Sequence, residues 1–248
     1  MKGFPATQIS LEGAFNFRDL GGLPVRGGGV TRAGRLFRSD TLQALSAGDV
    51  DKLSGTIGLR SVIDLRLPQE VAEQGRGPLA QVPTIRYFNA PLRMASTDGV
   101  LRGQVLSHLY TSCVESPSLA AAVIQLAEVV EHPCLFHCAA GKDRTGILAA
   151  LTLGIVGVDD DSIVDDYLCS SGNMARIVDR FRTWPRYREH IEAMPPEVYR
   201  VDAKPILEFL AILRARYGGA EGWVAHMGVP LTSVAALRRH LVTSPDDQ

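Results

Sequence analysis

Apolar residues recur along the chain with two different periods, and their positions predict an alternation of strands and helices. Short apolar runs between polar residues predict buried strands at residues 36–38, 61–65, 84–89 and 134–138. Longer runs with helical spacing predict helices at residues 46–53, 100–113, 116–131, 145–156, 159–169, 202–217 and 231–242. Such alternation is typical of the α/β fold class, so we expect a central, mainly parallel sheet flanked by helices.

Two segments interrupt the alternation. Residues 13–34 are rich in glycine and are expected to form turns. Residues 172–200 are rich in arginine, and we expect them to form a lid-like insertion of short helices, which extends to residue 226 in the wider interpretation. Four apolar side chains in this insertion have helical spacing and are expected to pack against the body of the protein: Met174, Ile177, Val178 and Phe181. The chain as a whole, residues 1–248, is expected to be a single domain.

Composition narrows the class of protein. The 248 residues carry a formal net charge of -1, with 46% hydrophobic and 21% charged residues, as in ordinary globular proteins. A charge so near zero argues against a nucleic-acid partner, whose phosphates would need a basic excess. No apolar run approaches the roughly 20 residues that span a bilayer. The N-terminus lacks a secretory signal, so we expect a cytoplasmic location, with non-classical secretion and the oligomeric state left open.

The strongest chemical signal is the string HCAAGKDRTG at residues 137–146, which lies between a predicted strand and a predicted helix. Its backbone N–H groups can surround a tetrahedral dianion at the start of that helix. Arg144 can hold two phosphoryl oxygens with its planar fork, and the same positive field favours a thiolate at Cys138. We therefore expect Cys138 to be the nucleophile. The predicted phosphate-binding residues are Ala139, Ala140, Gly141, Lys142, Asp143 and Arg144.

Three further roles are assigned around this loop. Thr145 is expected to hydrogen-bond the sulfur, and His137 is expected to orient the loop from beneath. A general acid should stand opposite the nucleophile, because the leaving oxygen needs a proton. Asp143 and Asp64 are both candidates, and we favour Asp143 as the acid and Asp64 as an organiser of the site that pairs with a nearby arginine.

Other uses of the same cysteines conflict with the predicted strand. Cys134 and Cys138 suggest a redox pair, and with His132 and His137 they suggest a zinc site. A strand over residues 134–138 separates its ends by about 13 Å at about 3.3 Å per residue. A disulfide needs Cα atoms within about 7 Å, and four zinc ligands must lie closer still. We therefore expect neither a disulfide nor a metal here.

The loop resembles the signature of the protein-tyrosine phosphatase superfamily. Together with NFRDLGG at residues 16–22, it resembles the bacterial protein-tyrosine phosphatase B family, the tyrosine/serine or triple-specificity phosphatases. Further matching segments are GRLFRSD (34–40), SVIDLR (61–66), DDYLCSSGN (165–173) and GVPLTSVAALRRHLV (228–242). The resemblance implies one phosphatase domain with a helical lid, phosphotyrosine as substrate, and no cofactor. It also supports Asp143 as the acid.

Lys142 departs from the commoner tyrosine-phosphatase loop, which has a small residue there. An extra cation suggests contact with a second phosphate, so we expect phosphoinositides as additional substrates. Phosphoserine and phosphothreonine are further candidate substrates that do not depend on this cation. The alternative is that Lys142 is a solvated loop residue. Arg18 and Asp19 are interpreted equally as a wall of the phosphate pocket or as a charged turn that braces it.

The sequence predicts supporting or protective roles for several other residues. Arg38 and Ser39 are expected at the rim of the pocket, and Arg66 is a weaker candidate. The acidic run at residues 159–166 is expected to be a helix N-terminus and its solvated face. The lid is expected to recruit anionic substrate and to shield the thiolate from oxidation. Two other classes stay open: a phosphate-binding module without turnover, and another thiolate enzyme such as a sulfurtransferase or an arsenate reductase.

Overall fold

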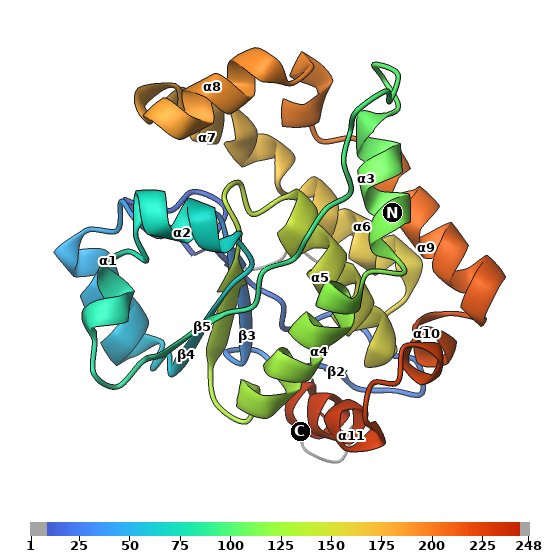
Figure 1. The fold of residues 1–248 in the computed structure, drawn as a ribbon. Coiled ribbons are helices and arrows are strands. Elements are labelled where there is room, and N and C mark those ends of the chain that lie inside the picture. The colour runs from blue at the N-terminus through green and yellow to red at the C-terminus, as the bar shows by residue number, and fades with distance from the viewer. Residues whose placement is uncertain (1–8, 244–248) are drawn as a thin grey trace.

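A five-stranded sheet forms the centre of the molecule. The structure, a computed structural model, describes residues 9–243. The strands lie in the order β1-β3-β6-β4-β5 (Figure 1). They are β1 Arg18–Asp19, β3 Leu36–Ser39, β6 Cys134–His137, β4 Ser61–Asp64 and β5 Arg86–Asn89. All neighbours pair in parallel except β1, which is antiparallel to β3, so the predicted mainly parallel sheet is confirmed.

Side chains that alternate along each strand fill two separate cores. Leu36, Ile63 and Phe136 point into the larger core. That core also contains residues of α3 Val105–Cys113, α4 Pro117–Val129, α5 Asp143–Ile155, α6 Asp160–Leu168, α9 Ala203–Tyr217, α10 Ala220–His226 and α11 Leu231–Leu241. Phe37, Val62 and Leu135 point into the smaller core on the opposite face. That core includes residues of α1 Ala47–Asp51, η1 Lys52–Thr56 and η2 Pro78–Gln81.

Every strand predicted from the apolar runs is present, and most helix predictions are confirmed with small shifts at their ends. The helix predicted at 100–113 begins only at Val105. The helix predicted at 46–53 continues as the π-helical turn η1, and it starts with a capping box formed by Ser46 and Asp49. No helix in residues 9–243 is both long enough and apolar enough to cross a membrane.

The prediction failed for several short elements. The glycine-rich segment contains β1 and also β2 Val30–Thr31, which pairs with β7 Val242–Thr243 near the other end of the chain. Helix α2, Pro68–Gln74, and helix α10 were also missed. A strand of two residues is too short to show a periodic pattern. The strand that pairs with β2 lies more than two hundred residues away, so no local pattern indicates this pairing.

Helices α7 Ser171–Thr183 and α8 Pro185–Ala193, with the 3-10 turn η3 Pro196–Tyr199, extend over the carboxyl end of the sheet (Figure 1). We call residues 171–200 the lid. Its apolar stripe packs on the loop after β6, because Met174, Ile177 and Phe181 form one buried cluster with Ala139. The predicted packing of this stripe against the body is therefore confirmed.

Candidate active site

The strand register brings the chemically important loop to one edge of the sheet. Ser39 at the end of β3 and Asp64 at the end of β4 both lie opposite His137, the last residue of β6. The loop from Cys138 to Lys142 leaves β6 at this edge and leads into α5, which begins at Asp143. Ligands of open α/β sheets bind at this carboxyl edge, so the topology places the loop where a site is expected.

Two side chains from the N-terminal segment hold the loop backbone from beneath. Asn16 Nδ2 donates to the carbonyl oxygens of Ala140 (3.2 Å) and Gly141 (3.1 Å). Arg38 Nη2 donates to the carbonyl of Gly141 at 2.8 Å. Gly141 itself has a φ of 67°, and a Cβ atom there would lie 2.5 Å from the carbonyl oxygen of Ser39. Glycine is therefore required at this position by both backbone conformation and space.

The remaining carbonyls of the loop are also held away from the site. His137 Nδ1 donates to the carbonyl of Cys138 at 3.0 Å, and the Thr41 N–H donates to the carbonyl of Ala139 at 2.9 Å. Within residues 9–243, the backbone N–H groups from Ala139 to Arg144 donate to no other protein group. With its carbonyls held below, the loop presents these N–H groups as a nest for an anion at the start of α5.

Buried ion pairs support these side chains in turn. Asp166 of α6 accepts from Arg18 Nε at 2.7 Å and from Arg38, and all three side chains are almost completely buried. Arg18 also donates to Asn16 Oδ1 at 2.6 Å. Burial would raise the pKa of Asp166, but the two arginines hold it below its ordinary value. The interpretation of the acidic run as a solvated helix face is therefore wrong for Asp166, which anchors the scaffold.

The other residues proposed around the pocket lie in this lower layer as well. Arg18 contacts the scaffold rather than the cavity, which favours the bracing interpretation over the wall. Asp19 accepts from the N–H groups of Gly21 and Gly34 and so fixes its own turn. Arg38 and Ser39 are fully buried, so the expectation that they lie at the rim of the pocket is wrong.

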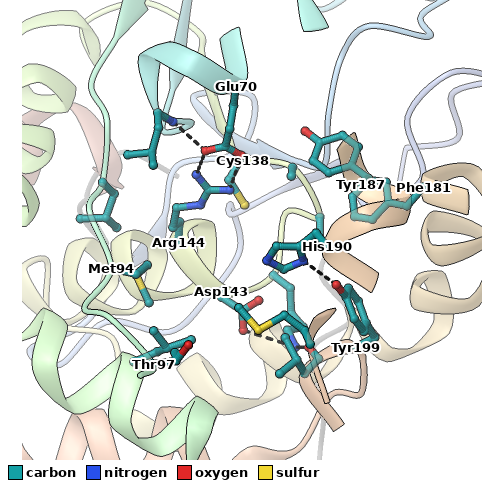
Figure 2. A pocket seen from close by; sticks show the side chains of 18 of the residues that line it. Glu70, Met94, Thr97, Cys138, Asp143, Arg144, Phe181, Tyr187, His190 and Tyr199 are labelled. Atoms are coloured by element: carbon teal, nitrogen blue, oxygen red, sulfur yellow. Dashed lines mark hydrogen bonds and ion pairs between the residues drawn. The ribbon is translucent and has the colours of Figure 1, made fainter. Parts of the chain in front are cut away.

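Cys138 lies at the base of a cavity of about 450 Å³ and is 3% exposed (Figure 2). The walls are largely apolar and come from α3, α7, α8 and the segment after β5. They include Leu92, Met94, Leu109, Met174, Phe181 and Tyr187. Thr145 Oγ1 is buried and has no hydrogen-bond partner among residues 9–243. The predicted bond from Thr145 to the sulfur is thus not formed in this structure.

Arg144 is fixed by a residue that the sequence analysis missed. Its Nη1 and Nη2 atoms donate to the two carboxylate oxygens of Glu70 at 2.6 and 3.0 Å (Figure 2). Glu70 also accepts from the Leu67 N–H and so begins helix α2. Burial would raise the pKa of Glu70, but the bonds from Arg144 hold it below its ordinary value. A guanidinium has five N–H groups, so three remain for a phosphate.

Asp64 is positioned for a structural role. It is fully buried, and its Oδ2 accepts from Arg66 at 2.6 Å and from the Tyr87 hydroxyl at 2.5 Å. His137 Nε2 lies 3.6 Å away. Burial would raise the pKa of Asp64, whereas His137 and Arg66 lower it to about 2. A carboxylate that stays ionised in such contacts is a poor proton donor, so the geometry favours Asp64 as an organiser.

Asp143 lines the cavity with Cys138 and is within reach of bound substrate. Its neighbour Lys142 lines the same cavity, but its ammonium is engaged: it donates to the carbonyls of Val198 (2.5 Å) and Arg200 (2.9 Å) and lies 3.3 Å from Asp143 Oδ1. Its side chain is buried, so the alternative of a solvated loop residue is wrong. Lys142 instead joins the phosphate loop to the end of the lid.

The arginines of the lid are mostly engaged with the protein itself. Arg180 pairs with the buried carboxylate of Asp40 and donates to the carbonyl of Gly13 at 2.7 Å. Arg180 also lies over the ring of Phe15, with 4.3 Å from Cζ to the centroid. Arg186 pairs with Glu73 of α2 at 2.5 Å. These contacts attach the lid to the rest of the protein, and they leave less positive charge to recruit substrate than the sequence suggested.

A reactive cysteine in an anion-binding loop, followed at the start of a helix by arginine, defines the class of cysteine-dependent phosphatases. The chain belongs to the tyrosine phosphatase family, whose model matches residues 9–243.

The chain is similar to several known proteins. The triple specificity protein phosphatase PtpB of Mycobacterium tuberculosis is 28% identical over 92% of this chain and 96% of that protein. A Cupriavidus necator protein, named as a candidate tyrosine-protein phosphatase, is 36% identical over 68% of this chain but only 64% of its own length. The core catalytic domain of the PP-IP phosphatase SIW14 from S. cerevisiae overlaps 74% of this chain and 95% of that one, with 18% identity and a TM-score of 0.40.

Proposed function

We propose that this protein hydrolyses phosphotyrosine monoesters through a phosphocysteine intermediate. The observation that carries the proposal is the meeting of Cys138, Arg144 and a loop whose backbone N–H groups have no acceptor among residues 9–243, all at one cavity. The names of the relatives support it, since they are tyrosine or triple-specificity phosphatases. A phosphate-binding module without turnover would need neither a nucleophile nor a proton donor beside the nest.

The first chemical step uses three of these groups. The phosphate occupies the nest, and Arg144 binds two of its oxygens while Glu70 keeps the guanidinium in place. The Cys138 thiolate attacks phosphorus, an S–P bond forms, and the bond from phosphorus to the tyrosine oxygen breaks. Asp143 gives its proton to the departing oxygen, which leaves as neutral tyrosine.

The second step returns the enzyme to its starting state. A water molecule attacks phosphorus on the side that tyrosine has left, and the Asp143 carboxylate takes one of its protons. The S–P bond breaks, so inorganic phosphate and the Cys138 thiolate are released. All groups needed for both steps belong to the chain, and we expect the reaction to proceed in EDTA.

The cavity walls favour an aromatic leaving group. Met94, Leu109 and Phe181 line the cavity that contains Cys138, and apolar walls suit the ring of phosphotyrosine better than a polyhydroxylated inositol. Phosphoserine and phosphothreonine remain proposed as weaker substrates, because their short side chains reach less of this apolar surface.

Phosphoinositides are the second candidate substrate class, and Lys142 is its basis. The ammonium can bind a second phosphate only if it exchanges the carbonyls of Val198 and Arg200 for that phosphate. If it does, Lys142→Ala should lose more activity on multiply phosphorylated lipids than on singly phosphorylated ones. Comparable losses on both would remove this role.

A substrate panel tests the proposed function. We expect kcat/KM in EDTA to be highest for a phosphotyrosine peptide, measured beside matched phosphoserine and phosphothreonine peptides and phosphoinositides. A phosphoinositide that is clearly preferred would contradict phosphotyrosine as the main substrate. Phosphate binding without release from any member of the panel would favour the binding module.

A further inference from the structure

Two buried tyrosines form a hydrogen-bonded chain that ends on Asp143. Tyr110 of α3 is completely buried, and its hydroxyl lies 2.9 Å from Asp143 Oδ1. The same hydroxyl lies 2.9 Å from the hydroxyl of Tyr167 of α6. The two rings meet edge to face, with 6.1 Å between their centroids. Neither tyrosine lines the cavity, and neither has a part in the steps described above.

The direction of this chain follows from counting protons. A tyrosine hydroxyl has one proton to donate, and an ionised carboxylate can only accept. Tyr110 therefore donates to Asp143, and Tyr167 donates to Tyr110. Burial raises the pKa of both hydroxyls, and the charge of Asp143 raises them further, so both remain protonated donors throughout the working pH range.

The contacts of the Asp143 carboxyl with Tyr110 and Lys142 go to one of its two oxygens, Oδ1. Lys142 Nζ, at 3.3 Å, faces the same Oδ1 as Tyr110. Oδ1 thus has two proton-donating partners, the neutral Tyr110 hydroxyl and the Lys142 ammonium, whereas Oδ2 has no protein partner among residues 9–243. A proton on Oδ2 leaves both contacts to Oδ1 intact, because a carbonyl-like oxygen accepts hydrogen bonds as well.

We propose that Tyr110, supported by Tyr167, is a positioning residue that keeps Oδ1 of Asp143 occupied and leaves Oδ2 to carry the catalytic proton into the cavity. The inference rests on the proposed function, since it places the proton of that reaction's general acid on one particular oxygen of the Asp143 carboxyl. It explains why two polar hydroxyls are buried between α3, α5 and α6, where two phenylalanines would fill the same space without hydrogen-bond demands.

The test compares two aryl phosphates that differ in their need for an acid. Phenyl phosphate releases a weakly acidic phenol, whereas p-nitrophenol leaves readily without a proton. We expect Tyr110→Phe to lower kcat/KM for phenyl phosphate roughly tenfold, the size of a lost bond to a charged group, and to lower that for p-nitrophenyl phosphate about twofold or less. Tyr217→Phe is the matched control and should change neither, because its hydroxyl contacts exposed Glu115 and no other group in the described part of the chain.

Two further measurements separate positioning from a merely structural role. In an Asp143→Asn background, Tyr110→Phe should have no additional effect on phenyl phosphate, because the proton it positions is gone. The basic limb of the kcat/KM profile should move to higher pH in Tyr110→Phe, because a donor that favours the ionised carboxylate has been removed. The other groups that face Asp143 are Lys142, His190 of α8 and Tyr199 of η3, and all three are unchanged in this variant.

Tyr167→Phe provides the second variant, because it keeps the bond from Tyr110 to Asp143 and removes only the donor behind it. We expect a loss of about twofold to threefold, again confined to phenyl phosphate. Equal losses on both phosphates, or the same loss in the Asp143→Asn background, would overturn the role of Tyr110 alone. A folded wild-type chain that hydrolyses neither phosphate would overturn the proposed function and this inference with it.

Discussion

The phosphate loop is held from below and covered from above by two contact surfaces of different character. Below it, Asn16, Arg18, Arg38 and Asp166 form a buried network in which nearly every polar group has a partner. Above it, the lid contributes an apolar stripe around Phe181 and a few ion pairs near its edges. We therefore expect the lower layer to fix the geometry of the nest. The lid makes fewer polar contacts with the loop, namely the bonds from Lys142 to the carbonyls of Val198 and Arg200.

The largest effect should come from breaking the lower layer. Asp166→Asn removes the negative charge between two buried guanidinium groups, so we expect a loss of about 3–5 kcal/mol in the free energy of unfolding. Because Arg38 and Asn16 then hold the loop less firmly, kcat/KM should fall at least about a hundredfold. Urea unfolding and steady-state kinetics measure the two quantities.

Asp161→Asn, on the exposed face of the same helix, is the matched control for this change. We expect it to alter the free energy of unfolding by less than about 0.5 kcal/mol. If Asp166→Asn changes the free energy of unfolding as little as Asp161→Asn does, the buried ion pairs of the lower layer do not stabilise the fold as proposed.

The next effect concerns the link between α2 and the loop. Glu70→Gln removes the charge that holds the Arg144 fork, and we expect kcat/KM to fall about tenfold to a hundredfold with the fold retained. Glu73→Gln, one turn along the same helix in an exposed pair with Arg186, should change kcat/KM less than about twofold. Similar losses in both variants would show that Arg144 is positioned by something other than Glu70.

These contacts also explain what could be predicted from the sequence. The four parallel strands, the loop and Cys138 follow from local patterns, because apolar runs and the string HCAAGKDRTG are contiguous. Glu70 and Tyr110 were missed, and Asp166 was misinterpreted as part of a solvated helix face, because each acts on residues at least 33 positions away. Lys142 was identified as important, but its lid partners are backbone carbonyls, which no sequence pattern marks.

Buried carboxylates around the phosphate loop should dominate the response to acid. The pKa of Asp64 is lowered to about 2, and those of Glu70 and Asp166 are lowered as well. Their ionised forms therefore stabilise the fold fully above the ordinary carboxyl pKa of about 4, and this contribution is lost as pH falls towards 2. We expect Asp64 alone to account for about 2 kcal/mol, measured by urea unfolding between pH 5 and pH 2.

A stability that stays flat over this range would contradict the assigned ionisation of these carboxylates. The matched comparison is Asp161→Asn, whose pH profile should follow that of the wild type because its exposed carboxyl takes no part in the network.

The smallest effect on stability is expected at the lid. Burial raises the pKa of Asp40, although Arg180 opposes this, so a carboxyl that loses Arg180 can protonate instead of remaining charged. Arg180→Met should therefore cost only about 1–2 kcal/mol while it loosens the lid. We expect iodoacetamide to alkylate Cys138 several-fold faster in this variant, as followed by peptide mass spectrometry.

Arg182→Met is the control for the lid, because the ion pair of Arg182 within residues 9–243 is with exposed Asp179 on the same helix. Its alkylation rate should match that of the wild type. If the alkylation rate of Cys138 is unchanged in Arg180→Met, the apolar stripe alone keeps the lid in place. That result would also argue against shielding of Cys138 by the contacts of Arg180.

The central claim is that Cys138 forms a covalent bond to phosphorus in a site that needs no metal. Hydrolysis of p-nitrophenyl phosphate in EDTA, by the wild type and by Cys138→Ser, tests it most directly. We predict sustained turnover by the wild type and a loss of about 10⁴-fold or more in the variant, because serine is a far weaker nucleophile at neutral pH. Turnover that is absent from the wild type, or that survives in Cys138→Ser, would contradict the claim.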